Sequence, residues 1–184
     1  DQWYDTRNMK TYVINPSKKS ALKTIWDRNY QDIYNDPGDF QTKKNEFGRH
    51  TLQKENGKLF LIGEGHTKEG QFPFIDQFDL NTLKTERLYK STATDKIESI
   101  SEIIDIKKGE ILVNIQSKND YPNYFFRNIK NRKGLQQITF NQNPFESIKD
   151  VHKEVIKYKR KDGVELSGTL YLPAGFDRTN PKQK

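Results

Sequence analysis

The sequence repeats one pattern: a strand-like run, a tight polar turn rich in lysine, and a second strand-like run. The three copies cover residues 11–26, 74–89 and 124–140. The second and third copies start about 50 residues apart, a period within the range of propeller blades. A unit of this kind cannot bury its apolar surface alone, so the pattern predicts neighbouring units stacked on one another.

Two further strand-like runs precede each of the last two copies. The apolar runs 59–62 and 111–115 each follow a short polar turn, and the runs 50–53 and 99–106 precede those turns. Each full unit is therefore predicted to be a sheet of four antiparallel strands. The continuous apolar runs indicate sheets that are covered on both faces, and stacked blades provide that cover.

These patterns predict an all-β fold: a partial β-propeller of four-stranded antiparallel blades. Residues 1–143 would form its C-terminal blades, with a partial blade over about 1–30 and full blades over 49–91 and 96–141. A propeller typically has four to eight blades, so we expect further blades outside this chain. The stretch between Asp27 and Gly48 is predicted to connect blades; a binding loop over the propeller mouth is the alternative.

The composition changes after Phe140. Residues 141–145 have the composition of a linker, and a hairpin of different character follows, with strands over 154–161 and 164–172 joined at Asp162-Gly163. An isolated two-stranded hairpin is marginally stable in water. Residues 144–184 are therefore predicted to be a linker and the first hairpin of another domain.

The charge of the chain permits binding to an anionic partner. Lys and Arg total 32 against 25 Asp and Glu, which gives a net charge of +7. A nucleic-acid site requires these charges on one face, whereas the lysines are spread through the turns. We therefore expect a solvated lysine-rich surface and no nucleic-acid partner. No apolar run approaches the length of a membrane span, so no membrane partner is expected either.

The sequence offers little catalytic chemistry. It has no Cys, which excludes disulfides, thiolate metal sites and a Cys nucleophile. It also has no Gly-x-Ser-x-Gly elbow. His50, His66 and His152 could each act as a general base, but none belongs to a catalytic or metal-binding signature, and each is predicted to be a surface or turn residue. We predict no catalytic, cofactor-binding or metal-binding residue, and no cofactor.

Residues 156–177 contain a tyrosine, the Asp162-Gly163 turn, and a leucine-rich strand that ends in Leu172-Pro173. This segment resembles the start of the catalytic domain in prolyl oligopeptidase-family serine peptidases, including bacterial dipeptidyl peptidase-like and acylaminoacyl-peptidase-like members. Residues 134–139 resemble the last propeller strand of that family, and 143–145 its crossing into the catalytic domain. The resemblance implies an α/β-hydrolase domain after this chain, and a periplasmic or secreted location, although no signal peptide is visible here.

The resemblance also implies a function. The chain would be the non-catalytic propeller portion of a serine peptidase that hydrolyses short peptides, with the propeller limiting access to the active site. The family's Ser, Asp and His lie downstream, and no position here matches them, so the chain alone is expected to be inactive. Expected partners are the peptide substrate of the parent enzyme, the missing blades and hydrolase domain in cis, and further copies of the chain through uncovered blade faces. The alternative is a stand-alone β-propeller interaction module without enzyme activity.

Overall fold

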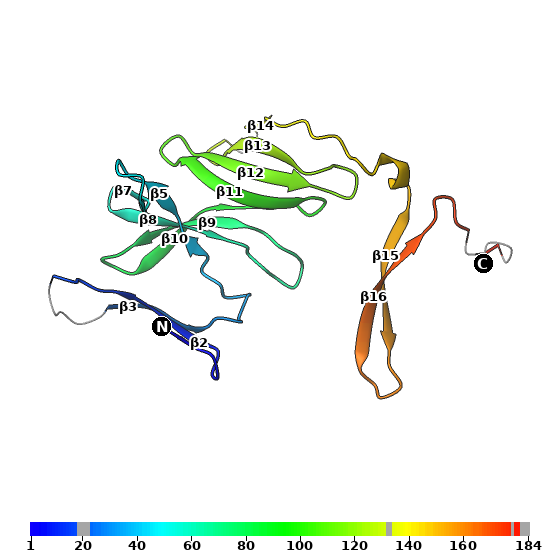
Figure 1. Ribbon diagram of the computed structural model, residues 1–184, viewed down its shortest axis with the longest axis horizontal. Helices are drawn as coiled ribbons and strands as arrows, with labels where there is room; N and C mark the ends of the chain where they lie inside the picture. The colour runs from blue at the N-terminus through cyan, green and yellow to red at the C-terminus, as the bar shows by residue number, and fades with distance from the viewer. Residues whose placement is uncertain (18–22, 132–133, 178, 181–184) are drawn as a thin grey trace. The chain divides into compact units, whose positions relative to one another are not determined.

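The computed structural model describes residues 1–17, 23–131, 134–177 and 179–180. Parts of two predicted lysine-rich turns, at 15–20 and 130–134, lie outside the described residues. The chain divides into two compact units, residues 1–141 and 142–184. The described residues form antiparallel sheets and one 3-10 turn, with no α-helix, which confirms the all-β prediction (Figure 1).

The first sheet has three strands in the order β1-β2-β3. Their bounds are Gln2–Trp3 for β1, Asn8–Val13 for β2 and Lys23–Asn29 for β3. The last two strands pair antiparallel, with Thr11 opposite Trp26. The first copy of the sequence repeat therefore forms the predicted strand pair.

The second sheet follows the order β10-β9-β8-β4, and β7 also pairs with β8. The strands are β4 (Asp39–Phe40), β7 (Lys54–Glu55), β8 (Lys58–Gly63), β9 (Phe74–Asp79) and β10 (Lys84–Lys90). The sequence predicted residues 50–53 as the outer strand beside β8, and this prediction is wrong. His50–Leu52 forms β6, which pairs with β5 (Thr42–Lys44) in a separate two-stranded sheet.

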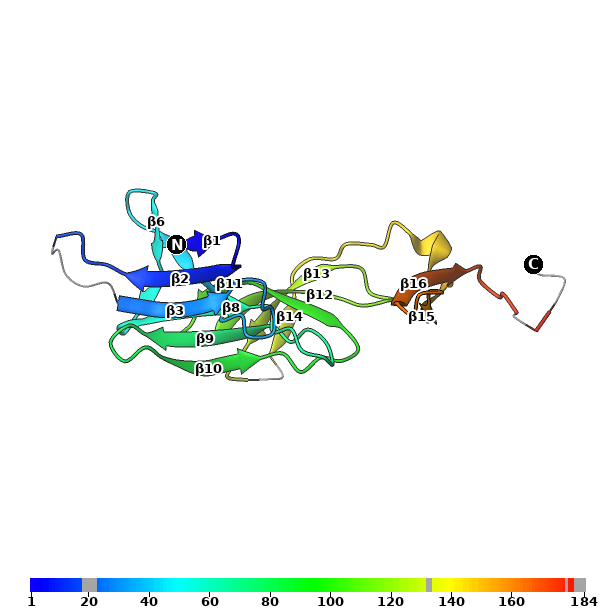
Figure 2. The same cartoon turned by 90° about the horizontal axis from the view of Figure 1, so that it is seen from below.

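The edge of the second sheet is one strand interrupted by a hairpin. Phe40 of β4 lies opposite Leu61, and Lys54 of β7 lies opposite Leu59, so β4 and β7 occupy successive stretches of the same strand, β8. The Gln41 amide donates to the Phe60 carbonyl at 2.8 Å. Residues 42–52, here called the inserted hairpin, then leave the sheet, and Figure 2 shows β6 projecting from the neighbouring strands.

The third sheet is the four-stranded meander that the sequence predicted, in the order β11-β12-β13-β14. Its strands are β11 (Ile97–Asp105), β12 (Glu110–Gln116), β13 (Asn123–Asn128) and β14 (Leu135–Gln137). β14 is shorter than the predicted run to Phe140. Beyond it, the Ile138 amide still donates to the Tyr124 carbonyl at 2.9 Å, so the chain follows β13 one residue further.

The second sheet is covered on both faces, as its continuous apolar run predicted. Side chains alternate across a strand, so Leu59 and Leu61 lie on the face opposite to Phe60. The first pair joins Phe78 in a core with Ile25 and Trp26 of the first sheet. Phe60 joins a second core, which buries residues of the third sheet: Ile103, Ile111, Val113 and Ile115. Three sheets are thus stacked through two apolar layers, without closing into a ring within the described residues.

The second unit contains the 3-10 turn Glu146–Ile148 and a hairpin of β15 (His152–Lys159) and β16 (Glu165–Leu172). The two strands pair in continuous register from His152 opposite Leu172 to Lys159 opposite Glu165. The Gly163 amide donates to the Arg160 carbonyl at 2.9 Å, and Gly163 has φ of 88°, which places the turn where the sequence predicted it. Apolar side chains stand on both faces of this hairpin, and Val155 is 67% exposed.

Candidate functional site

The three histidines lie on separate elements. His50 is in β6, His152 is at the start of β15 with its Nε2 3.1 Å from the Glu154 carboxylate, and His66 bridges to Gln71 in the loop after β8. Among the described residues, no imidazole is hydrogen-bonded to both a hydroxyl and a carboxylate, which is the arrangement of a serine-peptidase triad. No group of three His, Asp or Glu side chains in the described part of the chain could hold a metal ion.

The contact closest to catalytic geometry is in the inserted hairpin. The Thr42 hydroxyl lies 3.2 Å from Nδ1 of His50. A hydroxyl beside an imidazole is half of a nucleophile–base pair. Here both side chains are exposed, and neither ring nitrogen has a carboxylate partner within the described residues. The hydroxyl therefore orients the imidazole and does not form a triad with it.

No residue of the inserted hairpin belongs to either of the two apolar cores described above, so its conformation depends on contacts within its own turn. The Asn45 side-chain oxygen accepts hydrogen bonds from the amides of Phe47 and Arg49, both at 3.0 Å. Asn45 also pairs with Arg49 through its own amide at 2.9 Å, and Gly48 has φ of 72°. This turn fixes the local backbone and holds the Phe47 ring at the tip, 77% exposed.

The inserted hairpin carries three cations that have no carboxylate partner among the residues that the structure describes. In the part of the chain that the structure describes, Lys43, Lys44 and Arg49 enter no ion pair. The only acid of the hairpin is Glu46, beside the tip. The inserted hairpin is therefore a preformed, positively charged projection with one exposed aromatic ring.

Two lysines elsewhere in the first unit form contacts between neighbouring sheets. The Lys23 ammonium donates to the carbonyls of Leu80 at 2.8 Å and Asn81 at 2.9 Å, which joins the first sheet to the second. The Lys107 ammonium lies 2.9 Å from the Glu55 carboxylate, which joins the third sheet to the second. These contacts give the turn lysines a structural role that requires no anionic partner.

A buried polar network lies between β10 and the third sheet. The Tyr89 hydroxyl donates to one oxygen of Glu98 at 2.6 Å, and Nη2 of Arg127 donates to the other at 2.7 Å. Glu98 is 3% exposed. Burial, followed by the hydrogen bond to Glu98, raises the pKa of Tyr89 far above its usual range. Both carboxylate oxygens of Glu98 therefore accept a hydrogen bond from the protein, and the network links β10 to β11 and β13.

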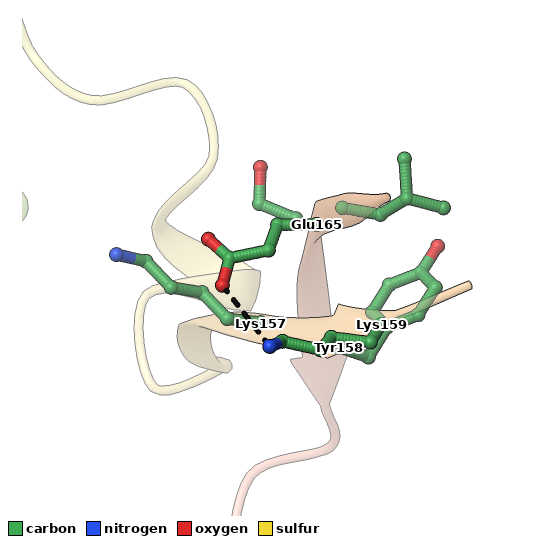
Figure 3. A pocket seen from close by; sticks show the side chains of 6 residues that line it. Lys157, Tyr158, Lys159 and Glu165 are labelled. Atoms are coloured by element: carbon green, nitrogen blue, oxygen red, sulfur yellow. Dashed lines mark ion pairs between the residues drawn. The ribbon is translucent and has the colours of Figure 1, made fainter. Parts of the chain in front are cut away.

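An open hollow of about 350 Å³ lies on the second unit. It is lined by Lys157, Tyr158, Lys159, Glu165, Leu166 and Ser167. Figure 3 shows the Lys159 ammonium turned toward the Glu165 carboxylate, and these groups lie 3.7 Å apart. Both walls come from one exposed two-stranded ribbon. The hollow therefore lacks the enclosing walls and converging polar groups of a substrate pocket.

The inserted hairpin was not predicted from the sequence as an element. Residues 27–48 were predicted to be a connection, and residues 50–53 a strand of the sheet. Asn45 and Gly48 were the available signal, because an Asn followed three residues later by Gly is typical of a hairpin turn with a bulge. The flanking Thr42, Lys43 and Lys44 are all polar, so no alternation of apolar and polar residues marked them as a strand.

Comparison with known proteins relates the chain to peptidases. No protein-family model matches it. It is 35% identical over 191 residues to a protein of Oryza sativa subsp. japonica named "Probable glutamyl endopeptidase, chloroplastic", and 35% identical over 192 residues to a protein of the same name from Arabidopsis thaliana. Each alignment covers 96% of this chain and 20% of the relative. The chain thus spans about a fifth of the length of these curated relatives.

A solved structure, the isopeptidase AtxE2, aligns with 72% of this chain and 21% of its own chain, with a TM-score of 0.38 and 9% identity. That likeness is too low to carry an argument about fold or function. No helix in the described ranges is long and apolar enough to cross a membrane. The sequence similarity to proteins named as peptidases is therefore the finding that bears on function.

Proposed function

We propose that this chain is the non-catalytic, propeller portion of a serine peptidase, and that its blades restrict the peptides that reach the active site. The proposal is carried by the 35% identity, over 96% of the chain, to proteins named glutamyl endopeptidase. An interaction module without enzyme activity is less well supported, because the similarity continues through nearly the whole chain and the relatives are named as enzymes.

The architecture supports the propeller part of this proposal. The second sheet presents apolar side chains on both faces, and each face is covered by a neighbouring sheet. Blades of a propeller are stacked in this way around a central channel. The first and third sheets each have one neighbour within this unit, so further blades would cover their outer faces.

The hairpin β15–β16 supports attachment to a catalytic domain. Val155, Tyr158 and Tyr171 are 67%, 52% and 60% exposed, although they are side chains that proteins normally pack. An α/β-hydrolase domain would supply the missing cover. That domain would also supply the serine, acid and histidine of the triad. The substrates would be peptides, and the names of the relatives make a glutamyl side chain beside the cleaved bond the preferred feature.

The test uses the full-length protein that contains this chain. We expect it to cleave a short fluorogenic peptide with glutamate at the cleavage site, and to spare a folded protein that carries the same sequence in an internal loop. Replacing the serine of a downstream Gly-x-Ser-x-Gly elbow by alanine should abolish cleavage. Retained cleavage in that variant would refute the serine mechanism. Equal cleavage of peptide and folded protein would refute restriction by the blades.

A further inference from the structure

The inserted hairpin has a position and a charge that the sheet itself does not require. It leaves the edge strand after Gln41 and returns at Gln53, and the Gln53 amide donates to the Gln41 carbonyl at 2.8 Å. The pairing of β4 and β7 with β8 therefore continues on both sides of the insertion. Because the hairpin packs into neither apolar core, its side chains are available to another molecule.

The register of the hairpin sorts its donors onto two faces. Lys44 lies directly opposite His50, so these two side chains share one face. Lys43 lies opposite Thr51 on the other face, and Arg49, at the closing pair with Asn45, belongs to that face as well. Each face thus presents two side chains that carry nitrogen donors.

The Thr42 hydroxyl prepares His50 for this role. When it donates to Nδ1 across 3.2 Å, the ring carries its proton on Nε2, which then serves as a donor on the face shared with Lys44. A carboxylate between Lys44 and His50 would accept a charge-assisted hydrogen bond from the ammonium and a second bond from the imidazole. The exposed Phe47 ring adds apolar contact at the tip.

We propose that the inserted hairpin binds acidic peptides, and that Lys44 and His50 hold a glutamate or aspartate carboxylate between them. This inference rests on the proposed peptidase function and deepens it, because it assigns recognition of acidic substrates to a surface outside the catalytic domain. A nucleic acid fits less well: a single strand needs a continuous track of phosphate contacts, whereas the hairpin divides its cations between two faces and carries Glu46 beside the tip.

The test measures binding without catalysis. A fluorescently labelled peptide in which glutamate alternates with serine is titrated with the chain and with the full-length protein, and its anisotropy is recorded. A second peptide replaces every glutamate with glutamine. We expect binding of the first peptide only. The double variant Lys44→Gln/His50→Gln should weaken that binding about tenfold, since two exposed polar contacts to a carboxylate are lost.

The second unit offers a matched control. The variant His152→Gln/Lys153→Gln also removes one histidine and one lysine from a hairpin, here at the start of β15. We expect it to change the affinity for the glutamate peptide less than twofold. Circular dichroism should show both variants folded, because neither pair lies in an apolar core.

Equal losses in the two variants would overturn the proposal, since they would indicate diffuse charge attraction. Equal binding of the glutamate and glutamine peptides, absence of binding, or displacement of the peptide by single-stranded DNA at lower concentration would also overturn it. Peptide binding with an inactive full-length enzyme would refute only the proposed peptidase function. An active enzyme without selective binding at the hairpin would refute only this inference.

Discussion

Replacing Glu98 by glutamine should destabilise the first unit strongly. The Glu98 side chain is 2% exposed and the Arg127 side chain 16% exposed, so their ion pair is buried. Removing one member of a buried pair leaves the other charge unpaired, which costs about 3–5 kcal/mol. We expect a loss in this range for Glu98→Gln, because Nε of Arg127 already lacks a hydrogen-bond partner and its guanidinium would keep only part of its stabilisation.

Two companion variants separate the contributions within this network. Tyr89→Phe removes the hydrogen bond from the hydroxyl to Glu98, and a hydrogen bond to a charged group contributes about 1.5–3 kcal/mol. The double variant Glu98→Leu/Arg127→Met removes both charges and retains apolar volume. Buried ion pairs replaced in this way are often neutral or stabilising, whereas the Tyr89 hydroxyl loses its acceptor. We therefore expect the double variant to lose about 1.5–3 kcal/mol, less than Glu98→Gln loses.

The measurement is urea unfolding followed by tryptophan fluorescence. Trp26 packs against Phe40 and Phe78, with ring centroids 5.1 and 5.7 Å away, so its emission should change when the sheets separate. Free energies are compared only where the dependence on urea concentration is unchanged. A loss below about 0.5 kcal/mol for Glu98→Gln, as is typical of surface substitutions, would refute the reasoning. A double variant less stable than the single one would refute it as well.

Three other predictions concern pH and backbone conformation. Burial and the hydrogen bond to Glu98 raise the pKa of Tyr89. The stability that this residue contributes is therefore complete below pH 10.0, the pKa of an unfolded tyrosine, and is lost as the pH rises further. The free energy of unfolding should decline more steeply with increasing pH for the unaltered chain than for Tyr89→Phe. The Lys58 ammonium and two turn amides lower the pKa of Asp79 from 3.8 to about 2, so the stability that Asp79 contributes is lost as the pH falls through that interval. NMR titration should find a higher pKa for Asp79 in Lys58→Gln. An unchanged pKa would contradict the pairing. Gly65→Ala would place a methyl group 1.9 Å from the Phe72 carbonyl oxygen at φ of 65°, and should cost about 3 kcal/mol or more in urea unfolding. Gly48→Ala, at φ of 72° with open space, should cost about 1 kcal/mol, and equal losses would contradict the steric argument.

The stacked sheets could be predicted from the sequence because the signal is local and repeated. The apolar run 59–62 is unbroken, and 111–115 is interrupted only at Asn114, which is typical of strands with two covered faces. Both runs form central strands, β8 and β12, in the predicted antiparallel sheets. The Asp162-Gly163 turn was equally clear, because glycine tolerates the positive φ that this turn requires.

The buried network could not be predicted in this way. Glu98 and Arg127 are 29 positions apart and lie on strands that are not neighbours in the third sheet. In the sequence Glu98 is one of three acids in β11, and Arg127 is a single charge in β13. Their pairing depends on Tyr89, which approaches them from the second sheet. The three side chains meet only because the two sheets stack, and the periodicity of a single strand does not indicate which sheets will stack.

The misplaced edge strand of the second sheet has a related cause. An edge strand needs pairing on one side only, and β4 and β7 supply it with two residues each. Segments of two residues are too short to show an alternation of apolar and polar side chains, so residues 50–53 were predicted to form the edge strand instead. The Gln53-to-Gln41 hydrogen bond closes the base of the insertion, and antiparallel pairing with β8 resumes at Lys54. The sheet therefore keeps its register whatever side chains the inserted hairpin carries. Substitutions at Lys44 or His50 would alter the proposed peptide binding, while the two apolar layers between the three sheets stay unchanged.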